Sequence, residues 1–84
     1  SSATYSILIV KTNNRPMLLY DISKILLKNK IVISMAKIST NGDFVEDSFH
    51  LRSEYGSKIQ NEITITNLKT EIQNKLNQNL SNAI

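Results

Sequence analysis

The sequence predicts an α+β domain in which a small antiparallel sheet carries two helices on one of its faces. Apolar residues follow strand-like and helix-like spacings in the order strand, helix, strand, strand, helix. The two consecutive strands are joined by a short Asn-Gly turn, which makes them antiparallel neighbours. With 84 residues, of which 40% are apolar, the chain has room for one modest core, so residues 1–84 are predicted to form a single domain.

The first strand is predicted at residues 5–10, Tyr5-Ser6-Ile7-Leu8-Ile9-Val10. Large apolar residues occur at odd and at even positions of this run. Because apolar side chains on both faces are typical of a strand that is covered on both sides, this strand is predicted to be central in the sheet.

A polar turn and a helix follow the first strand. Pro16 stands near the first helical turn, where a helix tolerates proline best because that N–H has no intrahelical partner. Asn13 or Asn14 is predicted to cap this helix with its side chain. The helix is predicted to end near Asn29-Lys30, and its apolar face is formed by Leu18, Leu19, Ile22, Ile25 and Leu26.

The next two strands form a hairpin. The first, residues 31–40, changes the parity of its apolar residues between Ile33 and Ala36, which predicts a bulge or bend near Ser34-Met35. Asn41-Gly42-Asp43 is the turn, because Asn and Gly accept positive φ angles. The second strand, residues 44–53, alternates regularly but places one carboxylate, Asp47, on its apolar face.

The remainder of the chain is predicted to end in a second helix. Residues 55–57 break the strand pattern, and Lys58-Ile59 is predicted to be a short extended piece. Residues 62–65 are assigned to a loop, so the helix is predicted to begin near Thr66-Asn67. Its apolar stripe consists of Leu68, Ile72, Leu76 and Leu80.

This order of elements is that of a ferredoxin-like βαββα fold, which normally closes with a fourth strand. Residues 81–84 are too few for a convincing strand. The fourth strand is therefore predicted to be absent, cut off, or supplied by another chain.

Composition removes several classes of function. Without cysteine the chain has no disulfide, thiolate metal site or thiol nucleophile, which fits a reducing compartment. No apolar run approaches the roughly 18 residues of a membrane span and no signal-peptide pattern is seen, so a cytoplasmic location without a membrane partner is predicted. The lysines are scattered, so the net charge of +3 does not indicate a nucleic-acid partner.

The residues also predict no chemistry of the chain's own. His50 is the only histidine, and one histidine cannot make a metal site, so it is predicted to lie on a solvated face. Asp47 has no second polar group beside it on its strand and is predicted to make a structural hydrogen bond. No catalytic residue, metal or cofactor is therefore expected. The start at Ser1-Ser2, without methionine, suggests a segment of a longer multidomain protein.

Five runs of residues carry a resemblance to a known family. They are the apolar strand ending at Val10, the turn Asn14-Arg15-Pro16, the helix start Leu18-Leu19-Tyr20-Asp21-Ile22, the run from Ile33 to Thr40, and Gly42 with Val45-Glu46-Asp47-Ser48-Phe49. Together they resemble the ACT domains, which regulate enzymes by binding amino acids. The resemblance covers roughly residues 5–80, almost the whole chain.

Within that family the chain is most similar to the C-terminal ACT repeats of the protein-PII uridylyltransferases, the bifunctional uridylyltransferase/uridylyl-removing enzymes of bacterial nitrogen control. Asn14 replaces the usual aspartate of their pattern, and Met17 stands where they have glycine. Glycine lets a ligand press against backbone N–H groups, so Met17 predicts weaker or lost binding. The chain keeps Arg15, Pro16, Leu18, Leu19, Ile33, Ala36, Ile38, Thr40, Asp47, Phe49, Gly56, Lys58 and Ile59.

The resemblance implies a regulatory domain that senses an amino acid, glutamine in those enzymes, and that influences catalytic domains outside this segment. The ligand would lie where two ACT domains pair, either in tandem or in a homodimer. The implied ligand-binding residues are Asn13, Asn14, Arg15, Met17 and Leu18 in the turn, and Ile33, Ser34 and Met35 in the second strand of the paired domain.

Two other functions are compatible with the same pattern. An ACT-like domain without a ligand would serve only dimerisation or interdomain scaffolding, and Met17 favours this function. An RNA-binding module shares the order of strands and helices, but it stacks bases on exposed aromatic residues of its central strands. Phe49 has the core-facing parity of its strand, and the glycine-aromatic signature of those modules is missing.

Overall fold

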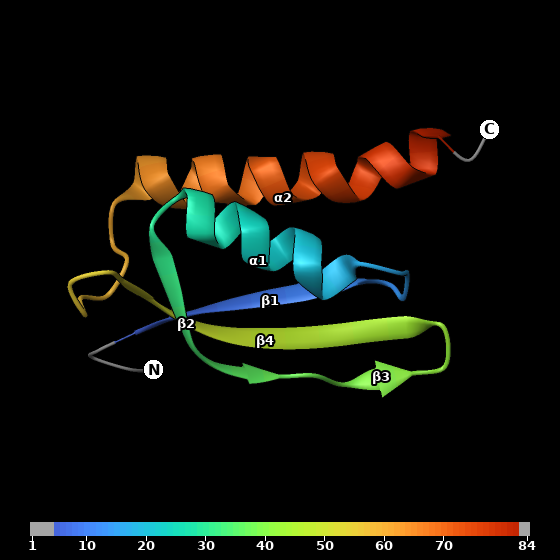
Figure 1. Cartoon of the computed structure of the whole chain (residues 1–84), viewed down its shortest axis with the longest axis horizontal. Coiled ribbons are helices and arrows are strands. Elements are labelled where there is room, and N and C mark those ends of the chain that lie inside the picture. Colours follow the sequence, from blue (N-terminus) through green and yellow to red (C-terminus); the bar gives the residue numbers. More distant parts are fainter. Residues whose placement is uncertain (1–4, 83–84) are drawn as a thin grey trace.

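The structure is an antiparallel sheet covered by two helices on one face (Figure 1). The computed structural model describes the backbone of residues 5–82 and the side chains of residues 5–77. The predicted α+β fold class and the placement of both helices are confirmed. The elements are β1 (Ser6–Asn13), α1 (Leu18–Lys28), β2 (Ile31–Lys37), β3 (Thr40–Asn41), β4 (Phe44–Ser53) and α2 (Glu62–Asn82).

The strand at the centre of the sheet is β4, with the order β1-β4-β2 and the short β3 also paired to β4. The prediction that the first strand is central is therefore wrong, because β1 has one strand neighbour within residues 5–82. Ile7 and Ile9, which suggested a second covered face, are 51% and 53% exposed. The apolar residues at odd positions of β1 thus lie on an uncovered face of the sheet.

This uncovered face, on the side away from the helices, is partly apolar. Four of its large apolar side chains are more than half exposed: Ile7, Ile9, Met35 and Phe44. The ring of Tyr5 stacks on the imidazole of His50, with 4.3 Å between centroids and 11° between planes. His50 lies on this uncovered face, as predicted, and is half-buried because the Tyr5 ring stacks on it.

The hairpin between β2 and β4 contains the predicted bulge. The register moves from Ile33 opposite Leu51 to Met35 opposite His50, so Ser34 is the extra residue. The Ser34 hydroxyl donates a hydrogen bond to the carbonyl of His50 at 3.1 Å. The predicted strand at residues 31–40 is divided, since β2 ends at Lys37 and β3 covers Thr40–Asn41. Gly42 takes a φ of 66° in the turn to β4, as the Asn-Gly pattern predicts.

The core lies between the sheet and the helices. Phe49 lies at the centre of this core and is 2% exposed. Its ring is therefore not available to stack on a nucleic-acid base. The predicted core-facing parity of β4 is confirmed. The buried apolar residues are Val10, Leu18, Ile22, Ile25, Leu26, Ile31, Val45, Phe49, Leu51, Leu68 and Ile72, with Leu8, Ile33, Ile59 and Leu76 packed at the margin.

Helix α2 begins one turn earlier than predicted, at Glu62. The side chain of Asn61 caps it by accepting a hydrogen bond from the Thr64 N–H at 3.0 Å. The predicted extended piece at Lys58-Ile59 is not a strand, although the Ser6 hydroxyl bonds both the N–H and the carbonyl of Ile59. Within residues 5–82 no strand follows α2. The predicted apolar stripe of this helix includes Leu80, whose side chain lies outside the described residues. The prediction about a fourth strand also involves residues 83–84, which lie outside them as well.

Neither helix of the described residues combines the length and the apolar character that a bilayer crossing requires. Over the same residues, no three side chains of the acidic or histidine type gather where they could hold a metal ion.

Candidate functional site

The turn between β1 and α1 is attached to the tip of the β3–β4 hairpin. Strand β1 continues to Asn13, which pairs with Phe44, and the next backbone N–H, that of Asn14, donates to the Asp43 carbonyl at 2.6 Å. This pairing holds both asparagines in the extension of the sheet. Neither of them caps α1, so the predicted side-chain cap is wrong.

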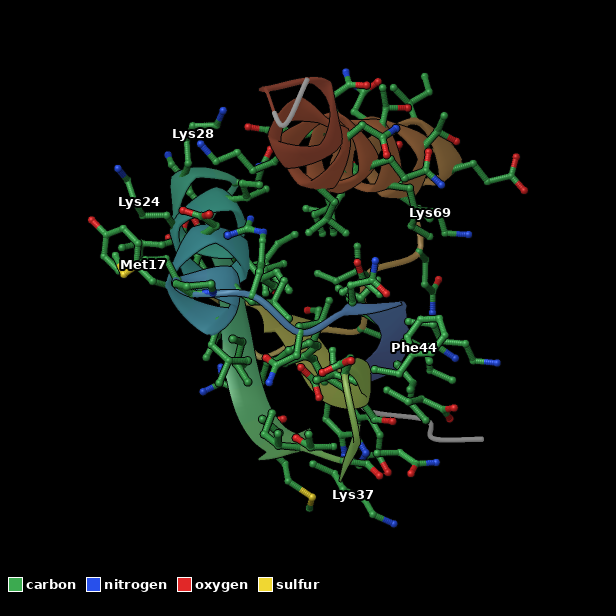
Figure 2. All side chains as sticks on the ribbon, turned by 90° about the vertical axis from the view of Figure 1, so that its right-hand side faces the viewer. Met17, Lys24, Lys28, Lys37, Phe44 and Lys69 are labelled. Atoms are coloured by element: carbon green, nitrogen blue, oxygen red, sulfur yellow. The ribbon has the colours of Figure 1, made fainter. Side chains whose placement is uncertain are left out.

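Met17 occupies the cap position of α1 in a left-handed conformation, with φ 67° and ψ 12°. This region of backbone space favours glycine, because an L side chain there meets its own backbone. The Met17 side chain is 59% exposed and points outward from the start of the helix (Figure 2). The turn therefore has the backbone shape that a glycine would adopt, with a methionine side chain added to its outer surface.

Arg15 fixes the turn to the first turn of α1. Its guanidinium donates to the Pro16 carbonyl and to Oδ2 of Asp21, in both cases at 2.8 Å. The side chains of Arg15 and Asp21 are only 18% and 16% exposed, so this ion pair is partly shielded from water. Asp21 also places negative charge at the N-terminus of α1, where the helix dipole favours it.

A pocket of about 240 Å³, here called the turn pocket, opens beside this turn. Buried residues from α1 and β4 form its floor, and the more exposed side chains form its rim. The first hydrogen bond inside α1 runs from the Asp21 N–H to the Met17 carbonyl, so the preceding N–H groups have no acceptor within the helix. The pocket is lined by Asn14, Arg15, Met17, Leu18, Leu19, Tyr20, Ile38, Thr40, Val45 and Asp47.

Asp47 is the only buried polar or charged side chain among residues 5–77, at 1% exposure. It lies in the middle of β4, opposite Val10 of β1. Its predicted structural hydrogen bond is absent at one oxygen, because Oδ1 accepts no hydrogen bond. A buried acceptor without a donor is uncommon in folded proteins and lowers their stability.

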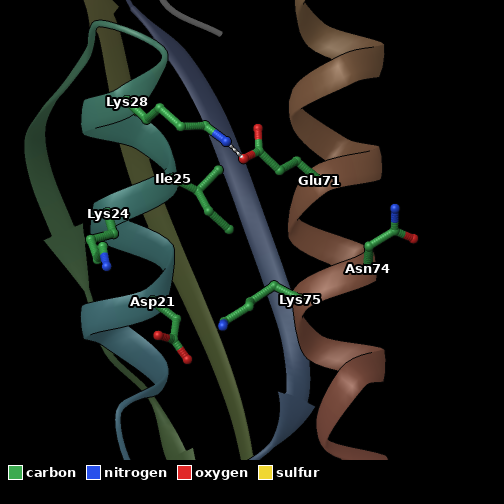
Figure 3. A pocket seen from close by; sticks show the side chains of 7 residues that line it. All are labelled: Asp21, Lys24, Ile25, Lys28, Glu71, Asn74 and Lys75. Carbon is green, nitrogen blue, oxygen red and sulfur yellow. Dashed lines mark hydrogen bonds and ion pairs between the residues drawn. The ribbon is translucent and has the colours of Figure 1, made fainter. Parts of the chain in front are cut away.

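A second and larger hollow, here called the helix groove, lies between α1 and α2. It has a volume of about 510 Å³ and is lined by Asp21, Lys24, Ile25, Lys28, Glu71, Asn74 and Lys75 (Figure 3). The ammonium of Lys28 forms an ion pair with Glu71 across the groove, and the Asn29 amide donates to the same carboxylate at 3.1 Å. The Lys28 hydrogen bond, followed by that of Asn29, lowers the pKa of Glu71 below its ordinary value.

Comparison with known proteins identifies the family. The sequence model described as the ACR family N-terminal ACT domain matches residues 1–79. The chain belongs to the ACT domain family. The resemblance carried by the turn, the first helix and the hairpin is thereby confirmed.

Relatives of this ACT domain include bifunctional uridylyltransferase/uridylyl-removing enzymes. Those of Ruegeria pomeroyi, Cereibacter sphaeroides and Azospirillum brasilense are 33%, 38% and 32% identical to it over 98%, 92% and 90% of its length. The ACT domain spans only 9%, 8% and 8% of those enzymes. It is thus homologous to a small part of each relative.

The ACT domain brings four of the predicted ligand residues to the turn pocket, namely Asn14, Arg15, Met17 and Leu18. Asn13 does not line the pocket, because it is the exposed last residue of β1. The three predicted residues of the second strand also lie elsewhere in the same chain: Ile33 is packed at the margin of the core, Ser34 is the bulge, and Met35 is on the uncovered sheet face.

Sequence reasoning missed the pocket residues that come from the sheet. Thr40 and Val45 meet the turn because they face each other in the β3–β4 register, on the helix side of the sheet. Ile38 lies on the rim next to them. The signal available in the sequence was Asp47, a carboxylate at a core-facing position of a regular strand. Its place in a pocket could not be inferred before the turn and β4 were known to be neighbours.

Proposed function

We propose that this chain is a regulatory ACT domain that binds a free amino acid, glutamine, in the turn pocket. Its parent protein is a cytoplasmic enzyme of the uridylyltransferase/uridylyl-removing class that controls nitrogen metabolism. The observation that carries the proposal is the position of the pocket, which combines the N-terminus of α1 with polar side chains over a buried floor. Homology to part of the uridylyltransferases supports the choice of parent, and glutamine is the ligand that the family resemblance implies.

The pocket suits a small zwitterion. Its volume of about 240 Å³ lies below the roughly 300–1,000 Å³ that accommodate drug-sized ligands, and therefore fits a molecule of few atoms. The N–H groups of Leu18, Leu19 and Tyr20 at the start of α1 attract a carboxylate, because they lack helical acceptors and carry the positive end of the helix dipole. Asn14 and Thr40 offer additional polar atoms for the amide of a glutamine side chain.

Regulation requires a second ACT domain, in tandem or in a homodimer. In this proposal the segment Ile33-Ser34-Met35 of the paired domain approaches the turn pocket. Together with Asn13 of the turn itself, this segment completes the pocket. The uncovered sheet face, with its exposed Ile7, Ile9, Met35 and Phe44, favours contact with another domain. Strand β2 is at the edge of the sheet within residues 5–82, so its outer side is available to approach the turn pocket of a neighbour. Glutamine then changes the activity of the parent enzyme only if it binds one arrangement of the pair more tightly than another.

A second candidate function is pairing without a ligand. It is favoured by the same apolar sheet face and by the thioether side chain of Met17 at the rim of the pocket. In this case the domain would hold its parent in shape, and the turn would have only a structural role.

The two functions are separated by titrating the chain with glutamine and with a panel of other amino acids, followed by NMR. Sensing predicts shifts confined to residues 13–20, 33–40 and 45–47, with saturation at millimolar concentrations or below. An absence of shifts up to millimolar ligand, together with a mass that rises with protein concentration in sedimentation equilibrium, would contradict sensing and support scaffolding.

The variant Met17→Gly sharpens this experiment. Glycine relieves the left-handed backbone of about 1 kcal/mol of strain and costs a similar amount through the flexibility of the unfolded chain, so the melting temperature is expected to change little. Sensing predicts that the wild-type chain binds glutamine and that Met17→Gly binds it more tightly, because the side chain no longer narrows the rim of the pocket. Binding by Met17→Gly alone would mean that Met17 closes the pocket, which contradicts sensing by this chain.

A further inference from the structure

We propose that the Asp47 carboxylate is the group that binds the ammonium of the amino acid in the turn pocket. This inference rests on the proposed function and names the chemical class that the pocket selects: a zwitterion with a primary amine, in preference to a simple carboxylate of the same shape.

The first argument is the state of the carboxylate. Asp47 is 1% exposed, and its Oδ1 accepts no hydrogen bond, although the residue lines the turn pocket. Burial of an acceptor without a donor costs about 1–3 kcal/mol, and more when the group is charged. A hydrophobic residue of similar size would avoid this cost. A ligand ammonium would supply both the missing donor and the opposite charge.

The second argument is the arrangement of charge in the pocket. The N-terminus of α1 lies at one wall and favours a carboxylate, whereas Asp47 belongs to the floor and favours a cation. An amino acid carries these two groups on one carbon atom. Its ammonium would point down toward β4 and its carboxylate toward the helix, which leaves the side chain directed to the rim.

The third argument is rigidity. Asp47 lies on the central strand of the sheet, between Val45 and Phe49, which are 4% and 2% exposed. The backbone of Asp47 is paired with Val10 of β1 on one side. The next residue, Ser48, is paired with Lys37 of β2 on the other side. A side chain on a backbone fixed in this way, buried between core residues, has few alternative positions, so that little conformational entropy is lost when a ligand binds.

The experiment removes the ammonium and the carboxylate separately. Calorimetry compares glutamine with 4-carbamoylbutanoate, the same molecule without the α-amino group, on the wild-type chain and on Asp47→Asn. The amide keeps the shape of the carboxylate but removes its charge. Glu46→Gln is the matched control, because Glu46 is the preceding residue of β4 and is exposed.

We expect loss of the amino group to weaken binding to the wild-type chain by about 10- to 100-fold, as befits a hydrogen bond between charged groups. Asp47→Asn should weaken glutamine binding by a similar factor and leave binding of 4-carbamoylbutanoate unchanged, so the two deletions are not additive. Glu46→Gln should bind both molecules like the wild-type chain. In the absence of ligand, Asp47→Asn should melt no lower than the wild-type chain, since it removes a buried charge.

The possible failures are distinguishable. If the wild-type chain binds no amino acid, the proposed function is contradicted and the role of Asp47 falls with it. If glutamine binds and Asp47→Asn retains its affinity, or if 4-carbamoylbutanoate binds as tightly as glutamine, the role of Asp47 alone is contradicted. The comparison of the two ligands on the wild-type chain decides the question even where Asp47→Asn fails to fold.

Discussion

The turn pocket and the helix groove both contain carboxylates, but those of the groove, Asp21 and Glu71, form ion pairs, whereas the buried Asp47 of the turn pocket has an oxygen that accepts no hydrogen bond. In the helix groove, Lys28 and Glu71 pair in contact with water, with 67% and 31% of their side chains exposed. In the turn pocket, Asp47 is 1% exposed and one of its oxygens accepts no hydrogen bond. The groove is also the larger hollow, with about 510 Å³ against about 240 Å³.

This difference teaches that volume alone is a poor guide to a binding site. An exposed ion pair contributes little to stability and needs no ligand, because water and its partner satisfy it. A buried acceptor that lacks a donor lowers stability, and a fold retains it where it serves a function. The smaller hollow is therefore the better candidate for a ligand site.

The largest expected effect tests whether the turn pocket is part of the core. Leu18 lines the pocket and is 4% exposed, so Leu18→Ala should lower the free energy of unfolding by about 2–5 kcal/mol. Lys75→Ala, in the wall of the helix groove, should change it by less than about 0.5 kcal/mol. Urea denaturation measures both variants. A loss of less than about 1 kcal/mol for Leu18→Ala would show that the pocket floor is not packed as the structure describes.

The next effect concerns Asp21, which lines the helix groove and also pairs with Arg15 of the turn pocket. Asp21→Asn weakens a partly shielded charged hydrogen bond and removes a negative charge from the first turn of α1. A loss of about 1–2 kcal/mol in unfolding free energy is expected. The loss should persist in about 1 M salt, because shielded pairs are screened less than exposed ones. A loss that disappears in salt would place this pair with the exposed charges of the groove.

The fold was predictable where one local signal dominates. Strand β4 has the predicted bounds, because alternation places Val45, Phe49 and Leu51 on one face without interruption. The parity change in β2 correctly predicted the bulge at Ser34. These features depend on the period of the side chains and need no knowledge of distant neighbours.

The wrong predictions have a common cause, which is contact between residues far apart in the sequence. Pairing with β4 extends β1 to Asn13 and keeps both asparagines away from the start of α1. Residue preferences at helix caps carry no information about such pairing. Apolar residues on both faces of β1 suggested a central strand, but one face is uncovered within the described residues. Helix α2 starts at Glu62 because Asn61 caps it, one turn before the predicted cap at Thr66-Asn67.

The candidate site was predictable in one half only. The turn residues Asn14 to Leu18 are contiguous, and their resemblance to ACT domains was readable in the sequence. The floor and the opposite wall come from Ile38, Thr40, Val45 and Asp47, which reach the turn through the strand register and the hairpin. From the sequence alone, Asp47 was a carboxylate at an unexpected, core-facing position. The pairing of the strands placed it in the turn pocket.

The smallest expected effect lies in the helix groove and depends on pH. The Lys28 and Asn29 hydrogen bonds lower the pKa of Glu71 in the folded chain below its value in the unfolded chain. The stabilisation is therefore complete above the unfolded-state pKa and is lost as the pH falls through the folded-state pKa.

Glu71→Gln should melt slightly below the wild-type chain at neutral pH, and the difference should shrink toward zero between about pH 5 and pH 3. In a Lys28→Gln background the same substitution should have less effect at neutral pH, because the first cause of the pKa shift is gone. Melting temperatures of the four chains over this pH range provide the measurement. A difference that stays constant with pH would mean that Glu71 acts through packing. The contrast between a paired carboxylate in the helix groove and Asp47, whose Oδ1 accepts no hydrogen bond, would then no longer hold.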